Sequence, residues 1–221
     1  YSFTSITGDE KCPEVLGGTV TLDEGEDITC TITNTRDTGE IVVNKEVDTN
    51  GDGEFEGGNE DANELGFRWG LDEETPDREM GESAGPLDTG TYEVSENDID
   101  GYHFVGWFEG EGTCEDPENT ELPASITVEE DQSTEITLCN ARDTGDLTIL
   151  KNVDGNGDGD INDEEDVIGA TNWTWDIAEG EQNIATGQTR ILPTGTYTIS
   201  EDLKEEFGLV SWSCSDETSG T

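Results

Sequence analysis

The chain has 221 residues, which allow one large domain or two small ones, and 56 Asp and Glu residues against 9 Lys and Arg residues give a formal net charge of −47. This charge argues against nucleic-acid binding and against docking on an anionic membrane, because both need a basic surface. No run of apolar residues is long enough for membrane insertion. Only 29% of the residues are hydrophobic, yet they fall in short alternating runs, as half-buried strands require.

So much negative charge repels itself and opposes compaction unless salt screens it or cations bind to it. We therefore expect a halophilic or marine prokaryote as the source. Bound calcium is a second way to offset the charge, and the two are compatible.

An internal repeat organises the chain. The block NTRDTGEIVVNKEVDTNGDGEFE at 34–56 returns as NARDTGDLTILKNVDGNGDGDIN at 140–162. The repeat predicts one complete unit at 39–142, the end of a preceding unit at 1–38 and the first part of a following unit at 143–221. We expect a segment equivalent to 1–38 to complete the last unit. It could come from a neighbouring copy, from the same chain folded back or from a longer precursor, because bare sheet edges are rarely left unpaired.

The complete unit has the pattern of an all-β protein, and no segment shows a helical period. Gly-, Asp- and Asn-rich turns separate the strand candidates. Six to seven short strands in a unit of this length predict tandem two-sheet β-sandwich domains of the prealbumin or Ig-like kind. The expected strands, in chain order, are 40–47, 65–71, 91–95, 103–108, 124–128 and 134–138.

Two acidic loops match the twelve-position calcium loop, whose carboxylate and amide oxygens alternate along the chain. The second, at 154–165, fits at every ligand position, and its candidate ligands are Asp154, Asn156, Asp158, Asp160, Asn162 and Glu165. The first, at 48–59, is weaker, because Asn59 takes the last position, where Glu60 or Asp61 could substitute. Its other candidates are Asp48, Asn50, Asp52, Glu54 and Glu56. The alternative for both loops is a solvated acidic turn.

Five cysteines are present, and the absence of a CxxC pair, with His103 the only histidine, argues against zinc. Their positions within the repeat predict the disulfides Cys12–Cys30 and Cys114–Cys139, with buried free thiols as the alternative. Cys214 would have its partner beyond residue 221. Oxidised pairs would place the protein outside the cytoplasm.

Three polar residues fall on the apolar faces of their strands under period-two alternation. Lys45 shares a face with Ile41 and Val43, while Glu96 and Asn140 take the matching places on two other strands. The following unit repeats this arrangement with Lys151 and Glu201, and its asparagine would be an equivalent of Asn34. A buried Lys beside a buried Glu is costly unless something compensates, and a buried ion pair is the simplest alternative.

Together with the segments LDTGTYEVSENDIDGY at 87–102 and LPTGTYTISE at 192–201, these residues resemble the Cna B-type, SpaA-like domains. Those are prealbumin-like sandwiches of surface adhesins and pilus shafts. The resemblance implies a spontaneous isopeptide bond. Lys45 would be the nucleophile, Glu96 the proton carrier and Asn140 the electrophile.

We therefore interpret the chain as an extracellular or cell-surface structural protein, in which calcium-stabilised sandwich repeats form a filament, fibre or stalk. The expected partners are copies of itself, joined head to tail, or adjacent repeats of the same chain. The alternative is a spacer or adhesion array in a large adhesin or in a polysaccharide-degrading enzyme. No activity on an external substrate is expected. The five tryptophans, at 69, 107, 173, 175 and 212, are expected in cores rather than on sugar-binding surfaces.

Overall fold

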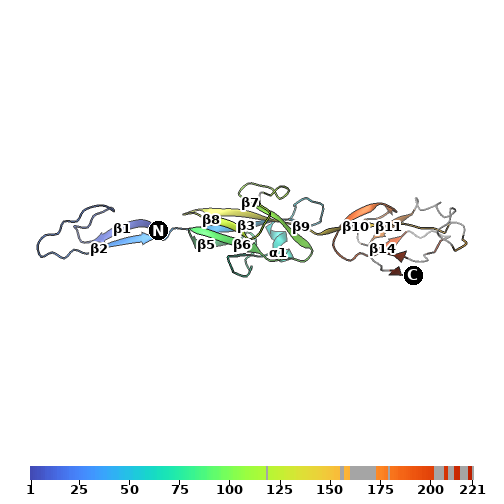
Figure 1. The fold of residues 1–221 in the computed structure, drawn as a ribbon, viewed down its shortest axis with the longest axis horizontal. Coiled ribbons are helices and arrows are strands. Elements are labelled where there is room, and N and C mark those ends of the chain that lie inside the picture. The colour runs from blue at the N-terminus through green and yellow to red at the C-terminus, as the bar shows by residue number, and fades with distance from the viewer. Residues whose placement is uncertain are drawn as a thin grey trace. The chain divides into compact units, whose positions relative to one another are not determined.

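The computed structural model describes residues 1–117, 119–154, 157–159, 173–178, 180–201, 207–208, 212–214 and 219–220. The chain divides into two compact units, Tyr1–Arg142 and Asp143–Thr221 (Figure 1). Nearly all regular structure is β, which confirms the predicted fold class. Within these ranges no helix has the length and apolar character needed to cross a bilayer.

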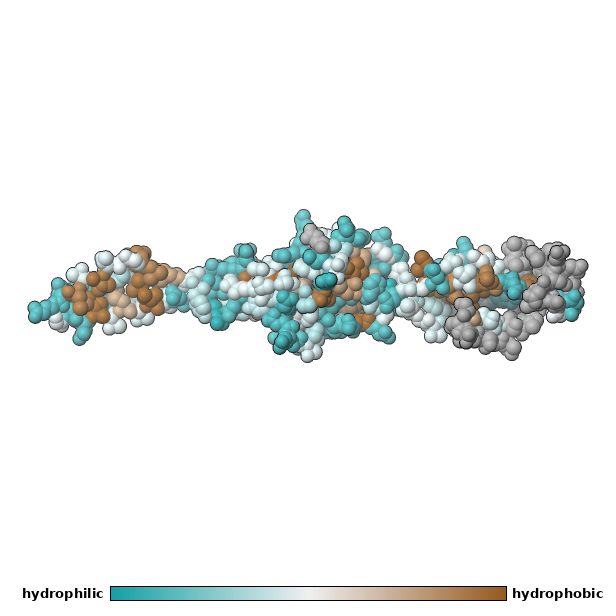
Figure 2. All heavy atoms as spheres, in the orientation of Figure 1, coloured by the Kyte–Doolittle hydropathy of each residue, from teal (hydrophilic) through white to brown (hydrophobic). Residues whose placement is uncertain are grey.

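The first unit begins with a hairpin, in which β1 (Ser2–Gly8) pairs antiparallel with β2 (Cys30–Thr35). Every residue of β2 is exposed, and Figure 2 shows hydrophobic residues on the surface of this hairpin. The strands and helix that follow are β3 (Thr38–Asp48), α1 (Asn59–Leu65), β4 (Trp69–Leu71), β5 (Ser83–Asp88), β6 (Gly90–Glu96), β7 (Tyr102–Glu109), β8 (Ala124–Val128) and β9 (Ser133–Arg142).

These strands form a two-sheet sandwich. One sheet has the order β5-β3-β9-β7 and the other β4-β6-β8. The central pair, β3 and β9, is parallel, and its register runs from Glu40 opposite Ser133 to Asp48 opposite Ala141. Alternate residues of β3 are buried, as period-two patterning requires. They pack into one core with residues from both sheets, among them Ile41, Val43, Trp69, Val94, Ile126 and Leu138.

Two parts of the sequence-based prediction are wrong. The expected strand 65–71 shortens to β4, because the preceding residues form helix α1. A side-chain oxygen of Asp61 accepts from the Gly58 N–H at 3.0 Å at the start of α1, and Gly66 ends it with a φ of 95°. Strand β5 was not predicted, since its sequence SAGPLD lacks the β-branched and aromatic residues that mark strands.

The second unit contains β10 (Thr144–Thr148), β11 (Thr174–Ile177), β12 (Ile184–Ala185), β13 (Thr189–Pro193), β14 (Ile199–Glu201), β15 (Trp212–Ser213) and β16 (Ser219–Gly220). Strand β10 pairs with β13, β11 lies between β12 and β14, and β15 pairs with β16. Its core contains Trp175, Ile177 and Ile184.

Four of the five tryptophans lie in or against cores. Trp69, Trp173 and Trp175 are buried, and Trp107 packs partly buried against the core of the complete unit. Trp212 contradicts the expectation of a core position, because half of it is exposed.

Candidate crosslink and metal sites

The sandwich core of the first unit contains a cluster of three polar side chains. Lys45 lies on the core face of β3, between Val43 and Val47, and only 2% of it is exposed. Its Nζ donates to Glu96 Oε2 on β6 and to Asn140 Oδ1 on β9, both at 2.5 Å. Two sheets and three strands therefore bring together a lysine, a glutamate and an asparagine that lie far apart in sequence.

Burial shifts the protonation of this cluster. Loss of hydration lowers the pKa of Lys45 to about 8, against the opposing effect of Glu96. Loss of hydration likewise raises the pKa of Glu96, although its contacts with Lys45 and Asn140 act in the other direction. Lys45 Nζ also lies 4.6 Å from the centre of the Phe67 ring, a neighbour that the sequence analysis did not single out. Both shifts favour a neutral amine beside a neutral carboxylic acid.

This arrangement has the three groups that amide exchange requires. A neutral amine is a nucleophile, the Asn140 amide carbon is an electrophile, and a carboxyl group that contacts both can move protons. Because the fold holds the amine and the amide carbon close together, the reaction does not require the two groups to meet by diffusion.

Among the described residues, the corresponding pair in the second unit contacts no asparagine side chain. Lys151 Nζ donates to both oxygens of Glu201 at 2.9 Å and lies 4.4 Å from the centre of the Trp173 ring. The Lys151 and Glu201 side chains are 16% and 25% exposed, against 0% and 4% for Lys45 and Glu96. The third candidate, Asn34, is exposed on β2, opposite Phe3 of β1.

The first acidic loop contains a carboxylate cluster that could hold a metal ion. Asp48, Asp52 and Glu56 offer oxygens that lie within 4.8 Å of one another. Asp48 is buried, and it accepts backbone N–H groups of Gly51 at 2.6 Å and Gly53 at 2.9 Å. Both glycines have positive φ, so the backbone wraps around the Asp48 carboxylate.

The other predicted ligands of this loop lie differently. Asn50 Oδ1 accepts the Asp52 N–H at 2.8 Å, and Glu54 is exposed. Asn59, Glu60 and Asp61 belong to α1 and are not part of the cluster. The Asn59 amide instead accepts the Lys45 N–H at 2.7 Å and donates to Asn44, so its side chain is engaged outside the carboxylate cluster.

The second acidic loop is described only in part. Asp154 Oδ1 accepts the Gly157 N–H at 2.5 Å and Oδ2 accepts the Gly159 N–H at 2.9 Å, which repeats the contacts of Asp48. Asp158 is exposed. The remaining predicted ligands, Asn156, Asp160, Asn162 and Glu165, lie outside the described residues.

Two disulfides join the cysteine pairs expected from the sequence. Cys114–Cys139 is buried beside Phe108 and Phe55, with Cα atoms 5.6 Å apart. Cys12–Cys30, with Cα atoms 5.7 Å apart, closes the hairpin. Cys214 is an exposed free thiol. The two bonds are compatible with an extracellular location.

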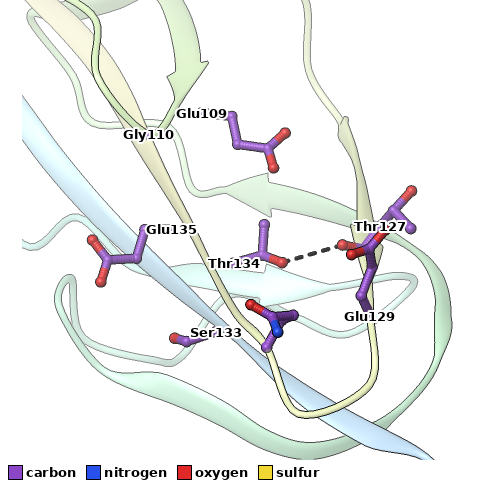
Figure 3. A pocket seen from close by; sticks show the side chains of 8 residues that line it. Glu109, Gly110, Thr127, Glu129, Ser133, Thr134 and Glu135 are labelled. Atoms are coloured by element: carbon purple, nitrogen blue, oxygen red, sulfur yellow. Dashed lines mark hydrogen bonds between the residues drawn. The ribbon is translucent and has the colours of Figure 1, made fainter.

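An open depression of about 510 Å³ at the end of the first sandwich was not anticipated. Glu109, Glu129 and Glu135 lie around it, and Thr134 Oγ1 donates to the Thr127 carbonyl at 3.2 Å (Figure 3). Its lining has no basic residue to offset these carboxylates, so the depression is a strongly acidic surface feature.

Residues 142–221 match a SpaA-type family model described as a prealbumin-like fold domain. No curated protein and no solved structure matches the chain significantly. The match covers the unit that contains Lys151 and Glu201, and it agrees with the resemblance found in the sequence motifs. The segment 142–221 is therefore similar to prealbumin-like fold domains of the SpaA type.

Proposed function

We propose that the chain is part of an extracellular structural protein in which calcium-stabilised β-sandwich repeats form a cell-surface filament, fibre or stalk. The observation that carries this proposal is the buried contact of Lys45 with Glu96 and Asn140. Family resemblance supports it, because prealbumin-like domains of this type are typical of pilins and adhesins. The net charge of −47 supports a saline habitat, in which salt screens the repulsion between repeats.

The role of the buried cluster is to link the first and last strands of a repeat covalently. Lys45 Nζ attacks the Asn140 side-chain carbonyl carbon, and Glu96 accepts a proton from the amine and delivers it to the leaving amide nitrogen. One C–N bond forms, one breaks and ammonia leaves. The reaction needs no external substrate, so the proposed role of the protein is structural and not enzymatic.

The acidic loops would hold calcium. Asp48, Asp52 and Glu56 supply hard oxygen ligands, which Ca²⁺ prefers, and a bound cation would remove the repulsion between three adjacent carboxylates. Asp154 and Asp158, with the undescribed remainder of their loop, would form the equivalent site.

Intact-mass measurement of the folded and then reduced chain tests the crosslink. Release of ammonia lowers the mass by about 17 Da per bond. We expect this loss in the wild type and not in the Lys45→Met, Glu96→Gln or Asn140→Ala variants. A wild-type mass equal to that of the unlinked chain would refute the covalent role.

A second candidate is a spacer or adhesion array in a large adhesin or in a polysaccharide-degrading enzyme. The half-exposed Trp212 is the observation that favours it, because an exposed indole can stack on a sugar ring. A loss of polysaccharide retention in a Trp212→Ala variant would support this candidate. Equal elution of both proteins from immobilised polysaccharides would argue against it.

A further inference from the structure

Two Asn-Gly pairs occur in the chain, and both lie in the acidic loops at matching positions of the repeat. They are Asn50–Gly51 and Asn156–Gly157. The backbone nitrogen of a residue that follows asparagine can attack the asparagine side-chain carbonyl carbon, and glycine hinders this attack least because it has no side chain. Only the first pair lies wholly within the described residues, so the surroundings of Asn50 decide what this sequence can do.

A carboxylate lies against the nitrogen that would attack. The Gly51 N–H donates to Asp48 Oδ1 at 2.6 Å, and Asp48 is buried. A carboxylate in this position can accept the proton that the nitrogen gives up as it forms a new bond. The second loop repeats the contact, because the Gly157 N–H donates to Asp154 Oδ1 at 2.5 Å. Both loops therefore place a proton acceptor at the glycine nitrogen of their Asn-Gly pair.

The side-chain amide of Asn50 is polarised by the residue two positions further on. Its carbonyl oxygen accepts the Asp52 N–H at 2.8 Å, and its Nδ2 donates to Asp52 Oδ2 at 3.1 Å. A donor at the carbonyl oxygen makes the carbon more electrophilic and stabilises the negative charge that develops on the oxygen during attack. Asn50 is exposed, so water can reach the product. The loop thus provides the nucleophile, its proton acceptor and an activated electrophile.

We propose that Asn50 is a self-modification site, which the folded loop converts to aspartate or isoaspartate. The Gly51 nitrogen attacks Asn50 Cγ while its proton passes to the Asp48 carboxylate. The bond between this nitrogen and Cγ forms, the bond from Cγ to Nδ2 breaks, and the departing nitrogen takes up one proton and leaves as ammonia. Water then adds to the cyclic imide and opens it at either carbonyl, which leaves aspartate or isoaspartate at position 50.

The modification would change the acidic loop in two ways. Either product adds a carboxylate between Asp48 and Asp52, and isoaspartate also lengthens the main chain, which displaces the residues that follow. A cation held by these two aspartates would engage the carboxylates that contact the reacting groups, so calcium should slow the reaction. This last expectation rests on the function proposed above, whereas the modification itself does not.

Asn63 provides a matched comparison within the same unit. Its side-chain carbonyl also accepts a backbone N–H, that of Met80 at 2.8 Å, so its carbon is polarised as well. The residue that follows is Glu64, whose side chain hinders attack and whose backbone is part of helix α1. Asn63 should therefore stay unmodified under conditions in which Asn50 reacts.

The test compares the folded 221-residue chain with a synthetic peptide of residues 47–57, both incubated in the same buffer with a chelator. Samples taken over time are denatured and cleaved after glutamate. The resulting fragment 47–54 contains Asn50 but neither Lys45 nor Asn140, so ammonia lost from it is distinct from ammonia released by the crosslink. Mass spectrometry detects the imide as a loss of about 17 Da and the hydrolysed products as a gain of about 1 Da.

We expect Asn50 to react at least about 10-fold faster in the folded chain than in the peptide, because only the fold supplies the proton acceptor and the oxyanion donor. Asp48→Asn should lower the rate to that of the peptide. Glu60→Gln, which removes an exposed carboxylate outside the loop contacts, should keep the wild-type rate. A folded chain that reacts no faster than the peptide, or an Asp48→Asn variant with the wild-type rate, would overturn the proposal.

Parallel samples with calcium in place of the chelator separate this inference from the proposed function. If the folded chain still reacts faster than the peptide but calcium leaves the rate unchanged, the modification stands and the calcium site in this loop is wrong. If ammonia is lost only through a bond between Lys45 and Asn140, the crosslink stands and the modification of Asn50 is wrong.

Discussion

Lys45 Nζ lies 2.5 Å from Asn140 Oδ1 in the core of the sandwich, although the two residues are 95 positions apart in sequence. The first and the last strand of the complete unit thus meet through these side chains as well as through their backbones. Four predictions follow from this contact and from the features around it.

Removal of the Asn140 side chain should destabilise the complete unit. Asn140→Ala takes a buried partner from Lys45, and we expect it to lower the free energy of unfolding by about 3 kcal/mol, even without counting a covalent bond. That loss corresponds to a fall in Tm of roughly 10–20 °C for a domain of this size. Asn34→Ala, the equivalent change at an exposed position, is the control and should leave the Tm of this unit unchanged. Equal effects of both variants would contradict the role of the buried contact.

The stability of an unlinked chain should rise with pH in the alkaline range. Burial lowers the pKa of Lys45 from its ordinary value of 10.5 to about 8 on folding. Between these values the unfolded state binds a proton that the folded state lacks, so the free energy of unfolding increases with pH. Below pH 8 both states bind the proton, and the full cost of burying the charge applies. Urea unfolding of Asn140→Ala between pH 7 and 11 measures the slope.

A matched variant isolates this effect. Lys45→Met in the Asn140→Ala background removes the titrating amine and keeps most of the side-chain volume. Its stability should therefore lack the alkaline rise, because the amine that takes up a proton in this pH range is no longer present. If both variants show the same slope, Lys45 is not its source.

Removal of calcium should lower the Tm of the complete unit, because the first acidic loop would lose its bound ion. A ligand at about 1,000 times its Kd stabilises the folded state by about 4 kcal/mol, and chelation should remove that contribution. Asp52→Asn takes one exposed carboxylate from the cluster, so titration calorimetry should show one site fewer. Glu111→Gln removes an exposed carboxylate outside the loops and should leave the stoichiometry unchanged. An Asp52→Asn variant with wild-type stoichiometry would exclude this cluster as a site.

The two disulfides should differ in their effect on the sandwich. Cys114–Cys139 is buried against Phe108 and closes a loop of 25 residues, so Cys114→Ala should cost about 3 kcal/mol. Cys12→Ala opens only the hairpin, and the Tm of the sandwich should stay within a degree or two of the wild type. Thermal unfolding followed by near-UV circular dichroism compares the variants. Equal losses would show that the hairpin and the sandwich unfold together.

The sequence predicted the parts of the fold that depend on period-two alternation. Lys45 shares its face with Ile41 and Val43, so its burial followed from the pattern alone. The same alternation put Glu96 and Asn140 on the apolar faces of their strands, and the resemblance to SpaA-like domains implied that the three side chains meet. Helix α1 could not be predicted in this way, because seven mostly polar residues with one buried side chain, Ala62, show no apolar stripe.

The carboxylate cluster of the first acidic loop shows a second limit of prediction. A linear ligand pattern placed the last ligand at Asn59, on the assumption that the loop continues without interruption. In the structure, the backbones of Val47 and Gly57 exchange hydrogen bonds of 2.8 and 2.9 Å, which closes the loop before Asn59 and leaves Glu56 as the carboxylate inside it. Such a tertiary closure leaves no signal in residue spacing.

The parallel pairing of β3 with β9 has a mechanical consequence. A stretching force applied through the residues on either side of the complete unit pulls these two strands in opposite directions along their length. Their backbone hydrogen bonds are then loaded in shear and must break together, which resists rupture far better than opening one bond after another. An amide bond between Lys45 and Asn140 would transmit the force directly from one strand to the other. Most of the sandwich would then bear no force when the chain is stretched.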